Sequence, residues 1–383
     1  MDYYTVMKKT LLALMLVVAM AVPTTAQANL KNSTADVPTI AVLDTALDTS
    51  IPAIKDHLVG EVCILDWTSC PNGSNFMEGE GSSVLPMNIL SSRDFNHGTQ
   101  MVSSIIQTNP NVNILFIRII GNTAAGARQT QKSTLVPNVL NWIYNNKQKY
   151  NIQAVSMSQG HHNLLSTADY CPVNSELESA LAKLSTLDVP VFFASGNQRD
   201  YKRVDWPACS SAPNVIGVSG AESYGAPALY SNFDVNRTDF FENGLLKIQF
   251  PGGNWDYSAG SSVATAVLAA KWMGIKTVKG SLTYSQIYNL FKSTAKTISS
   301  QNVQSALMID YMSALQGNAN VSTQSQSNAD KLAADKLAAD KAAIKAQAEK
   351  AIADAEAQYN LELKAAQDKL AAIKAQWLAK LNG

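Results

Sequence analysis

The chain has 383 residues, of which 46% are hydrophobic and only 16% are charged, so it can bury a sizeable core. Its 30 basic and 30 acidic residues give a formal net charge of zero. This balance argues against a nucleic-acid partner and against a broadly acidic ligand, because neither would meet a strong overall field.

Residues 1–28 have the pattern of a bacterial-type export signal. Lys8 and Lys9 precede an apolar run over residues 11–22, and small residues at 26–28 (Ala-Gln-Ala) form a cleavage position. The run is too short to span a bilayer comfortably, so we prefer a cleaved signal peptide to the alternative of a membrane anchor. We therefore expect a secreted or periplasmic protein with no membrane span after removal of the signal.

The chain contains four cysteines, which in an exported protein favour disulfides. Cys63 and Cys70 are close in sequence, and Cys171 and Cys209 remain as a second pair. Of the three pairings that four cysteines allow, we prefer Cys63–Cys70 with Cys171–Cys209. A metal site is disfavoured, because no Cys-x-x-Cys occurs and no histidine stands at a zinc-ligand spacing.

Short apolar runs alternate with helical segments through the first three quarters of the chain. This alternation predicts an α/β domain over residues 36–315, with a central parallel sheet and helices on both of its faces. Residues 66–93, rich in Gly, Ser, Asn and Pro, predict an irregular surface excursion. The expected strands are 39–43, 112–120, 154–158, 189–194 and 214–220, and the expected helices cover 101–106, 135–149, 176–184, 260–274 and 282–294.

The C-terminal part has a different composition. Residues 316–328 are polar and small, which predicts a flexible linker. Residues 329–381 are rich in Ala, Lys, Glu and Leu and open with repeats of Ala-Asp-Lys-Leu-Ala, which predicts a helical tail. Apolar residues recur there at heptad spacing, as in a coiled coil that would self-associate or bind a partner. The alternative is a single amphipathic helix lying on the domain. These residues form two series at seven-residue spacing: Ile352, Tyr359, Ala366 and Ile373 in one, and Leu363, Leu370 and Trp377 in the other.

Three polar residues, Asp44, His97 and Ser262, stand at the end of an expected strand or near the start of an expected helix. Open α/β sheets place their chemistry at the carboxyl ends of their strands. Each residue alone has an ordinary explanation, since a serine before an apolar helix is usually a cap. Together they could activate a hydroxyl nucleophile. His161 and His162 could bind a metal, but we favour a solvent-facing loop.

The motifs around these residues resemble those of the subtilase family, which has the same order of acid, base and serine. Residues 39–48 resemble its aspartate motif, 96–99 (Asn-His-Gly-Thr) its histidine motif, and 260–264 (Gly-Ser-Ser-Val-Ala) its serine motif. Residues 194–197 (Ala-Ser-Gly-Asn) are similar to its oxyanion segment. Residues 156–160 are similar to the strand that lines its specificity pocket.

The resemblance implies a subtilisin-like three-layer fold and a serine endopeptidase that cleaves peptides or proteins through an acyl-enzyme. Ser262 would be the nucleophile, His97 the general base, and Asp44 the group that orients His97. The side-chain amide of Asn197 and the backbone N–H of Ser262 would hold the oxyanion. Substrate would bind along Ser158, Gln159 and Gly160, beside Ala194, Ser195 and Gly196. No charge is evident at the pocket base, so we expect a medium or large apolar P1 residue.

The chain departs from the family pattern at positions that carry no catalytic group. Ala46 stands where glycine is usual, Gln100 where histidine is usual, and residues 265–266 (Thr-Ala) where Ser-Pro is usual. Residues 29–36 leave no room for an inhibitory pro-domain, so we expect the domain to fold unaided or with help from a partner or the tail. Catalysis should need no cofactor; relatives often bind structural calcium, but no acidic loop here has a readable ligand pattern.

Two rival functions are weaker. A catalytically silent subtilase fold could serve as a binding module, but the intact Asp44, His97, Asn197 and Ser262 argue against it. A lipase or esterase is disfavoured because no Gly-x-Ser-x-Gly elbow surrounds Ser262, and because the acid and the base precede the serine.

Overall fold

The computed structural model describes residues 37–317, apart from 68, 124, 130–133, 163–170, 172, 173 and 281, together with residue 364. The chain divides into two units, residues 1–317 and 318–383. The predicted signal peptide, nearly all of the predicted linker and the predicted tail with its coiled coil lie outside the described residues, apart from residue 364.

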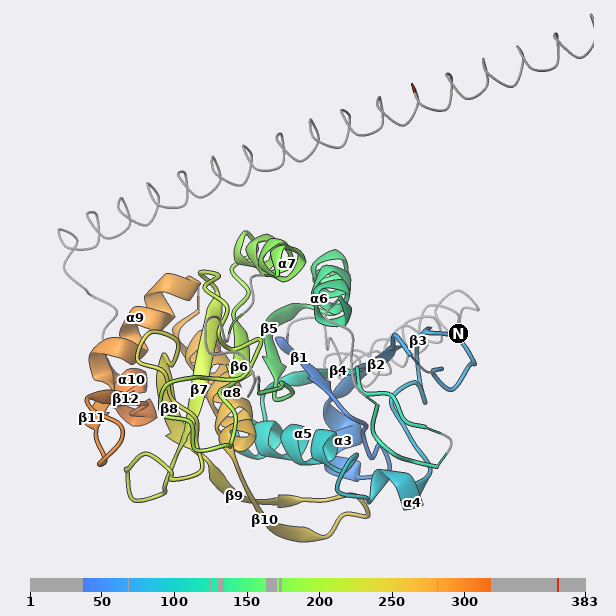
Figure 1. Ribbon diagram of the computed structural model, residues 1–383, viewed down its shortest axis with the longest axis horizontal. Coiled ribbons are helices and arrows are strands. Elements are labelled where there is room, and N and C mark those ends of the chain that lie inside the picture. The colour runs from blue at the N-terminus through green and yellow to red at the C-terminus, as the bar shows by residue number, and fades with distance from the viewer. Residues whose placement is uncertain are drawn as a thin grey trace, which may run out of the picture. The chain divides into compact units, whose positions relative to one another are not determined.

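Ten strands of the described residues pair into one sheet (Figure 1). They are β1 (Thr39–Asp44), β2 (Leu58–Ile64), β3 (Phe76–Glu78), β4 (Asn113–Arg118), β5 (Ile152–Met157), β6 (Val191–Ala194), β7 (Val215–Ala221), β8 (Phe240–Asn243), β11 (Lys296–Ile298) and β12 (Ala306–Met308). Their order is β11-β12-β8-β7-β6-β5-β1-β4-β2-β3. Neighbours from β12 to β2 are parallel, while the outer pairs β11–β12 and β2–β3 are antiparallel.

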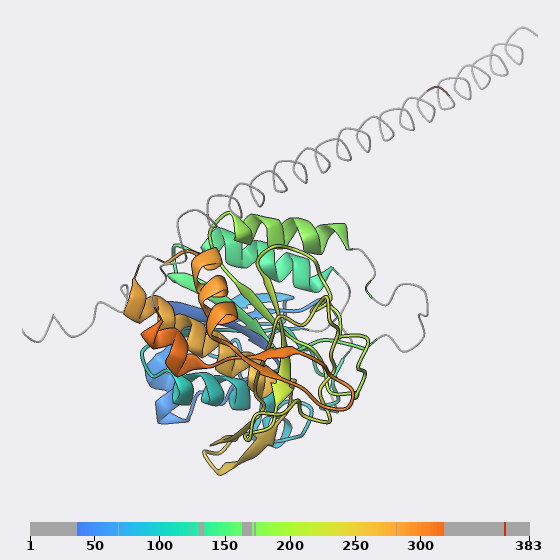
Figure 2. The ribbon, with the colours of Figure 1, turned by 90° about the vertical axis from the view of Figure 1, so that its left-hand side faces the viewer.

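Helices cover both faces of this sheet, as Figures 1 and 2 show. On one face, α5 (His97–Thr108) and α8 (Ser261–Lys279) pack with Ile40 and Val42 of β1. On the other, α6 (Leu135–Asn146) and α7 (Ser175–Ser185) pack with Ala41 and Leu43. Every residue of β1 is buried, as expected for a central parallel strand covered on both sides. The predicted three-layer α/β architecture is confirmed.

The remaining elements lie around this frame. Strands β9 (Leu245–Gln249) and β10 (Trp255–Ala259) form a separate antiparallel hairpin just before α8. Helix α9 (Tyr284–Thr294) begins with a capping box, in which the side chains of Thr283 and Gln286 each accept a hydrogen bond from the backbone N–H of the other residue. The other helices are α3 (Pro52–His57), α4 (Met87–Leu90), α9 (Tyr284–Thr294) and α10 (Tyr311–Gln316).

Five strands of the sheet, β2, β3, β8, β11 and β12, were not predicted. In two of them, β2 and β8, a buried glutamate interrupts the apolar run. In β2, the Glu61 carboxylate accepts hydrogen bonds from the backbone and hydroxyl of Ser83. In β8, Glu242 is buried and Lys271 of α8 donates to it at 2.7 Å; burial raises the pKa of Glu242, and Lys271 opposes this. Hydrogen-bond partners close in space reduce the cost of burying both carboxylates in the sheet. A polar residue nevertheless interrupts the apolar pattern that predicts a buried strand.

Helix α8 extends beyond the predicted end at Gly274, to Lys279. The glycine does not end the helix. Instead, the Tyr311 hydroxyl lies where a side-chain carbon of residue 274 would be. Gly274 therefore permits close packing of α10 against α8.

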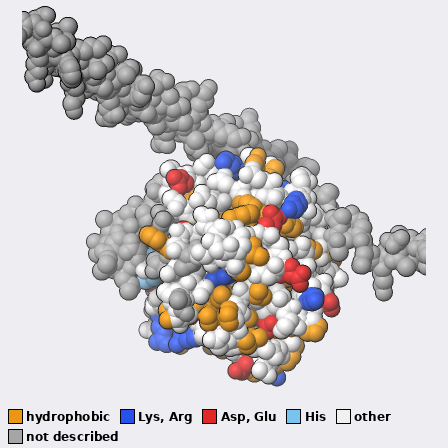
Figure 3. Space-filling model, turned by 90° about the vertical axis from the view of Figure 1, so that its right-hand side faces the viewer, with side chains coloured by type: hydrophobic (Ala, Val, Ile, Leu, Met, Phe, Trp, Pro, Cys, Tyr) orange, Lys and Arg blue, Asp and Glu red, His pale blue; other side chains and the backbone are white. Residues whose placement is uncertain are grey.

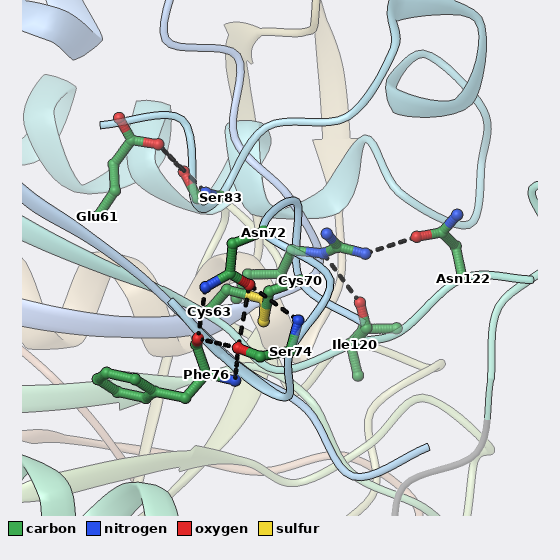
Figure 4. Close-up of a disulfide and its surroundings, with 10 residues drawn as sticks. Glu61, Cys63, Cys70, Asn72, Ser74, Phe76, Ser83, Ile120 and Asn122 are labelled. Carbon is green, nitrogen blue, oxygen red and sulfur yellow. Dashed lines mark hydrogen bonds between the residues drawn. A yellow bond between two sulfur atoms is a disulfide. The ribbon is translucent and has the colours of Figure 1, made fainter. Parts of the chain in front are cut away.

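The structure contains both preferred disulfides, with Cα–Cα distances of 5.9 Å for Cys63–Cys70 and 5.7 Å for Cys171–Cys209. Figure 4 shows the first of these under a turn in which the Asn72 side chain bonds the backbone of residues 74 and 76. Nearby, the buried Arg118 donates to Ile120 O and Asn122 Oδ1, and burial lowers its pKa to about 10.

The surface carries no dominant charge on the face seen in Figure 3, where isolated basic and acidic side chains lie among apolar and neutral ones. Within the residues that the structure describes, no helix combines the length and the apolarity needed to cross a bilayer.

Candidate active site

Strand β1 ends in a carboxylate that is fully enclosed by protein. Asp44 is 0% exposed, and its Oδ1 accepts the backbone N–H of Thr45 at 2.7 Å. Nδ1 of His97 lies 2.9 Å from Asp44 Oδ1 and 2.9 Å from Oδ2. The His97 side chain is 26% exposed, so one edge of the ring faces the carboxylate while part of it stays accessible.

The start of α5 is fastened directly to the end of β1. The Thr45 hydroxyl donates to Phe95 O at 2.9 Å and accepts the backbone N–H of Gly98 at 3.0 Å. A side chain at residue 98 would collide with the backbone oxygen of Ala46, so glycine is needed for this close approach. These contacts fix His97, the first residue of α5, opposite Asp44.

Ser262 lies in the first turn of α8 and is 9% exposed. Its hydroxyl donates to Ser158 O at 3.4 Å, and the Ser158 hydroxyl donates to Ser262 O at 3.0 Å. The longer bond is weak. It therefore does not hold the Ser262 hydroxyl firmly in place, and both Ser262 and His97 line the same cleft.

Asn197 follows strand β6 and faces the same helix start. Its Oδ1 accepts the backbone N–H of Ser261 at 2.9 Å, which leaves its Nδ2 as a donor. Gly260, the N-cap of α8, has φ +157°. A Cβ at Gly260 would lie 3.3 Å from Asn197 Nδ2 and 3.7 Å from the backbone nitrogen of Ser262. The missing side chain leaves a small space flanked by two N–H groups.

These residues border one cleft of about 890 Å³. The predicted substrate residues Ser158, Gly160, Ala194 and Gly196 line it. Ser195 does not fit that role, because its side chain is fully buried and directed at Ser231. Among the described residues, the cleft is lined by Arg93, Asp94, His97, Arg128, Gln129, Ser158, Gln159, Gly160, His161, Ala194, Gly196, Asn197, Gln198, Asp205, Trp206, Ser261 and Ser262.

The sequence did not predict that the side chain of Gln159 contacts Asp44. Gln159 was expected to offer its backbone to substrate, but its Nε2 lies 2.9 Å from Asp44 Oδ1. Arg128 donates to its Oε1 at 2.7 Å. The available signal was a glutamine two residues after the buried strand β5, at a position where an apolar residue would suit the core.

The cleft also has a charged group that the sequence analysis did not find. Asp205, whose side chain is 8% exposed, lines the wall beside Gly160 and Gly196. Burial raises the pKa of Asp205, and a hydrogen bond from His162 partly opposes this. His162 lies between Asp205 and Asp200 with its side chain 6% exposed, so the expectation of a solvent-facing loop is wrong for this residue.

In the described part of the chain, no group of three or more His, Cys, Asp or Glu side chains is arranged to hold a metal ion. The site offers instead a buried acid, a partly exposed imidazole, a hydroxyl and two N–H donors around one cleft. This set can transfer a proton from a hydroxyl and stabilise an oxyanion.

The comparisons with known proteins agree with this chemistry. The model of the Subtilase family, Peptidase_S8, matches residues 36–332. A search of curated proteins returned no significant match.

Solved structures similar to this chain include a mutant of the protease domain of PatA, with 16% identity, TM-score 0.56, and 73% of this chain and 94% of that chain covered. A protease from Pseudoalteromonas arctica has 17% identity and TM-score 0.58, with coverages of 74% and 90%. The epidermin leader peptide processing serine protease EpiP from Staphylococcus aureus has 18% identity and TM-score 0.56, with coverages of 73% and 74%.

Proposed function

Because the chain belongs to the subtilase family of serine peptidases, we propose that Asp44, His97 and Ser262 are its catalytic triad. The observation that carries this proposal is the approach of His97 Nδ1 to both oxygens of the buried Asp44, 2.9 Å from each, at a cleft that Ser262 also lines. In this arrangement Asp44 holds the proton on Nδ1, so that Nε2 is free to act as the base.

The reaction begins when His97 Nε2 takes the proton of the Ser262 hydroxyl, which attacks the substrate carbonyl carbon. His97 then gives that proton to the leaving amine, and the C–N bond breaks to leave an acyl-enzyme. Water then attacks the ester while His97 takes its proton, and His97 returns this proton to Ser262 Oγ as the C–O bond breaks and the acid product leaves. Asp44 stabilises the imidazolium in both halves of the reaction without taking the proton.

The oxyanion of each tetrahedral intermediate is assigned to the space next to Gly260. Asn197 Nδ2 and the Ser262 N–H flank that space, and the N-terminus of the 19-residue helix α8 adds a favourable dipole. Donors held in advance at the position of developing charge stabilise the transition state more than the ground state.

We propose that the substrates are peptides or proteins outside the cytoplasm. The two disulfides support an oxidising compartment, and residues 1–28 support export. Asp205 supplies a carboxyl group at the cleft wall, where the sequence showed no evident charge, so the P1 preference should be determined with a peptide library that includes basic as well as apolar residues.

The proposed chemistry uses no cofactor, since every proton transfer runs through side chains of this chain. Any calcium would act on stability alone. We expect a chelator to leave the initial rate unchanged at a temperature where the protein stays folded.

For residues 329–381 we propose self-association through the heptad positions. Removing residues 318–383 should lower the mass in solution to that of a monomer. An equal mass per chain with and without these residues would exclude self-association.

A fluorophosphonate probe tests the central proposal, because only an activated serine reacts with it. The wild type should be labelled and should cleave a peptide library, whereas Ser262→Ala should do neither. A folded wild type that resists labelling would favour the rival function, a binding module on a catalytically silent fold.

A further inference from the structure

Gln159 makes two polar contacts to the Asp44–His97 pair that the proposed mechanism does not use. Its Nε2 lies 2.9 Å from Asp44 Oδ1 and 2.9 Å from His97 Nδ1. Gln159 is 6% exposed, so bulk water does not compete freely for these contacts. It follows β5, which pairs in parallel with β1, and this register brings the glutamine beside Asp44.

The donors and acceptors of this group can be assigned. The Asp44 carboxylate only accepts, and a hydrogen bond to a charged group is roughly twice as strong as a neutral one. The proton of neutral His97 therefore resides on Nδ1 and is donated to Asp44. Gln159 Nε2 also donates to Asp44, so the contact between the two nitrogens joins two donors and is not a bond. The positive end of the Gln159 amide thus faces His97.

Arg128 fixes the orientation of this amide. Its Nη2 donates to Gln159 Oε1 at 2.7 Å. Because a guanidinium has donors only, Oε1 must face Arg128 and Nε2 must face Asp44. Arg128 is an exposed residue on the cleft. A continuous chain of hydrogen bonds thus joins the buried carboxylate to an exposed cation.

We propose that Gln159, held by Arg128, is a positioning residue that orients Asp44 and His97 and weakens the hold of Asp44 on the protonated form of His97. The proposal rests on the proposed triad. Donation from Gln159 spreads the charge of Asp44, and the positive end of the amide repels a cationic ring. Both effects disfavour protonated His97, so they extend activity toward lower pH.

Other charged or titratable groups line the same cleft as His97 and remain the same in every variant described below. They are Arg93 and Asp94 before α5, and His161 and Asp205. Any change in the pH profile that appears only when Gln159 or Arg128 is altered is therefore due to the Asp44–Gln159–Arg128 chain.

The first test compares Gln159→Met with Gln153→Met by measuring kcat/KM against pH. Methionine keeps the length of glutamine and removes its hydrogen bonds. Gln153 is the matched control, because it lies in β5 itself and bonds only to Asn151 among the described residues. For Q159M we expect kcat/KM to fall about tenfold. We also expect the acid limb of its pH profile, the low-pH range in which activity declines, to move to higher pH by roughly half a unit. Q153M should show neither change. An equal fall at all pH values, without displacement of the limb, would indicate packing alone and overturn the proposal.

The second test uses Arg128→Met, which alters an exposed residue and leaves the core intact. Its acid limb should move in the same direction by a smaller amount, since solvent and salt screen an exposed charge. In the Q159M background, R128M should have no further effect, because Gln159 transmits its influence. Additive effects of the two changes would refute the chain of hydrogen bonds.

Labelling with a fluorophosphonate separates failure of this proposal from failure of the proposed function. A wild type that does not react overturns both. A reactive wild type whose acid limb is unchanged in Q159M overturns only the role of Gln159.

Discussion

Two histidine–aspartate pairs each contribute one residue, His97 or Asp205, to the lining of the cleft. Their distances from Nδ1 to oxygen are nearly equal, 2.9 Å for His97–Asp44 and 2.8 Å for His162–Asp205. They differ at the other ring nitrogen. Nε2 of His162 lies 3.3 Å from Asp200, and its side chain is 6% exposed, compared with 26% for His97. We therefore propose His97–Asp44, and not His162–Asp205, as the catalytic pair, because His97 is the more exposed of the two histidines and lines the same cleft as Ser262.

The two aspartates differ in their surroundings as well. Asp44 receives donors from Thr45, which follows β1, from His97 at the start of α5, and from Gln159 after β5. Asp205 receives donors from His162, Asn232 and Gln198, which come from separate loops. The second set of contacts ties loops together beneath the cleft wall, so we expect its loss to affect stability before chemistry.

The largest difference between the pairs should appear on removal of the imidazole. His97→Ala should lower kcat by about 10⁶-fold, the size typical of a lost general base in a serine triad. Steady-state kinetics with an active-site titrant measures this. Activity within tenfold of the wild type would eliminate His97 as the base and remove the basis of the comparison.

Removing an oxyanion donor should have the next largest effect. Asn197→Ala should lower kcat by about 10²- to 10³-fold and change KM little, because the donor acts mainly in the transition state. Separate determination of kcat and KM checks this. A rise in KM with unchanged kcat would assign Asn197 to substrate binding instead.

For the second pair we expect an effect on folding. His162→Ala removes one partner from each of Asp205 and Asp200, and should lower the free energy of unfolding by about 1–3 kcal/mol. Urea denaturation measures this change. Fluorophosphonate labelling of the folded variant should persist; its loss would show that both pairs serve catalysis.

The smallest effect concerns pH. Because burial raises the pKa of Asp205 in the folded state, this group stabilises the fold most below its unfolded pKa of about 3.9. That contribution is lost as pH rises through the folded value. Relative to Asp205→Asn, the wild type should therefore lose stability as pH increases from acid toward neutral. Urea midpoints for both proteins across that range test the sign, and the opposite slope would show that His162 outweighs desolvation.

The sequence predicted the parts of the fold that depend on uninterrupted apolar runs. Strands such as β1 and β7 are buried along their whole length, so composition alone identifies them. Strands β2 and β8 contain Glu61 and Glu242, whose partners are distant in sequence or lie in other elements. Such partners are set by tertiary packing, which a local pattern does not contain.

The same limit applies to the candidate site. Asp44, His97, Ser262 and Asn197 occur in short motifs and could be selected from the sequence, and the structure brings them to one cleft. The inward turn of Gln159 and the burial of His162 depend on Arg128, Asp200 and Asp205. These contacts join segments far apart in the chain, so spacing could not predict them.

The hydroxyl of Thr45 has a consequence for motion. By bonding Phe95 and Gly98, it couples the end of β1 and the start of α5 into one rigid body that carries both Asp44 and His97. Ser262 belongs to a different helix. Breathing of the cleft should therefore change the separation of His97 from Ser262 while the distance from His97 to Asp44 stays constant. Under the proposed mechanism, activity would then vary with the distance between His97 and Ser262, while the distance between His97 and Asp44 stays fixed.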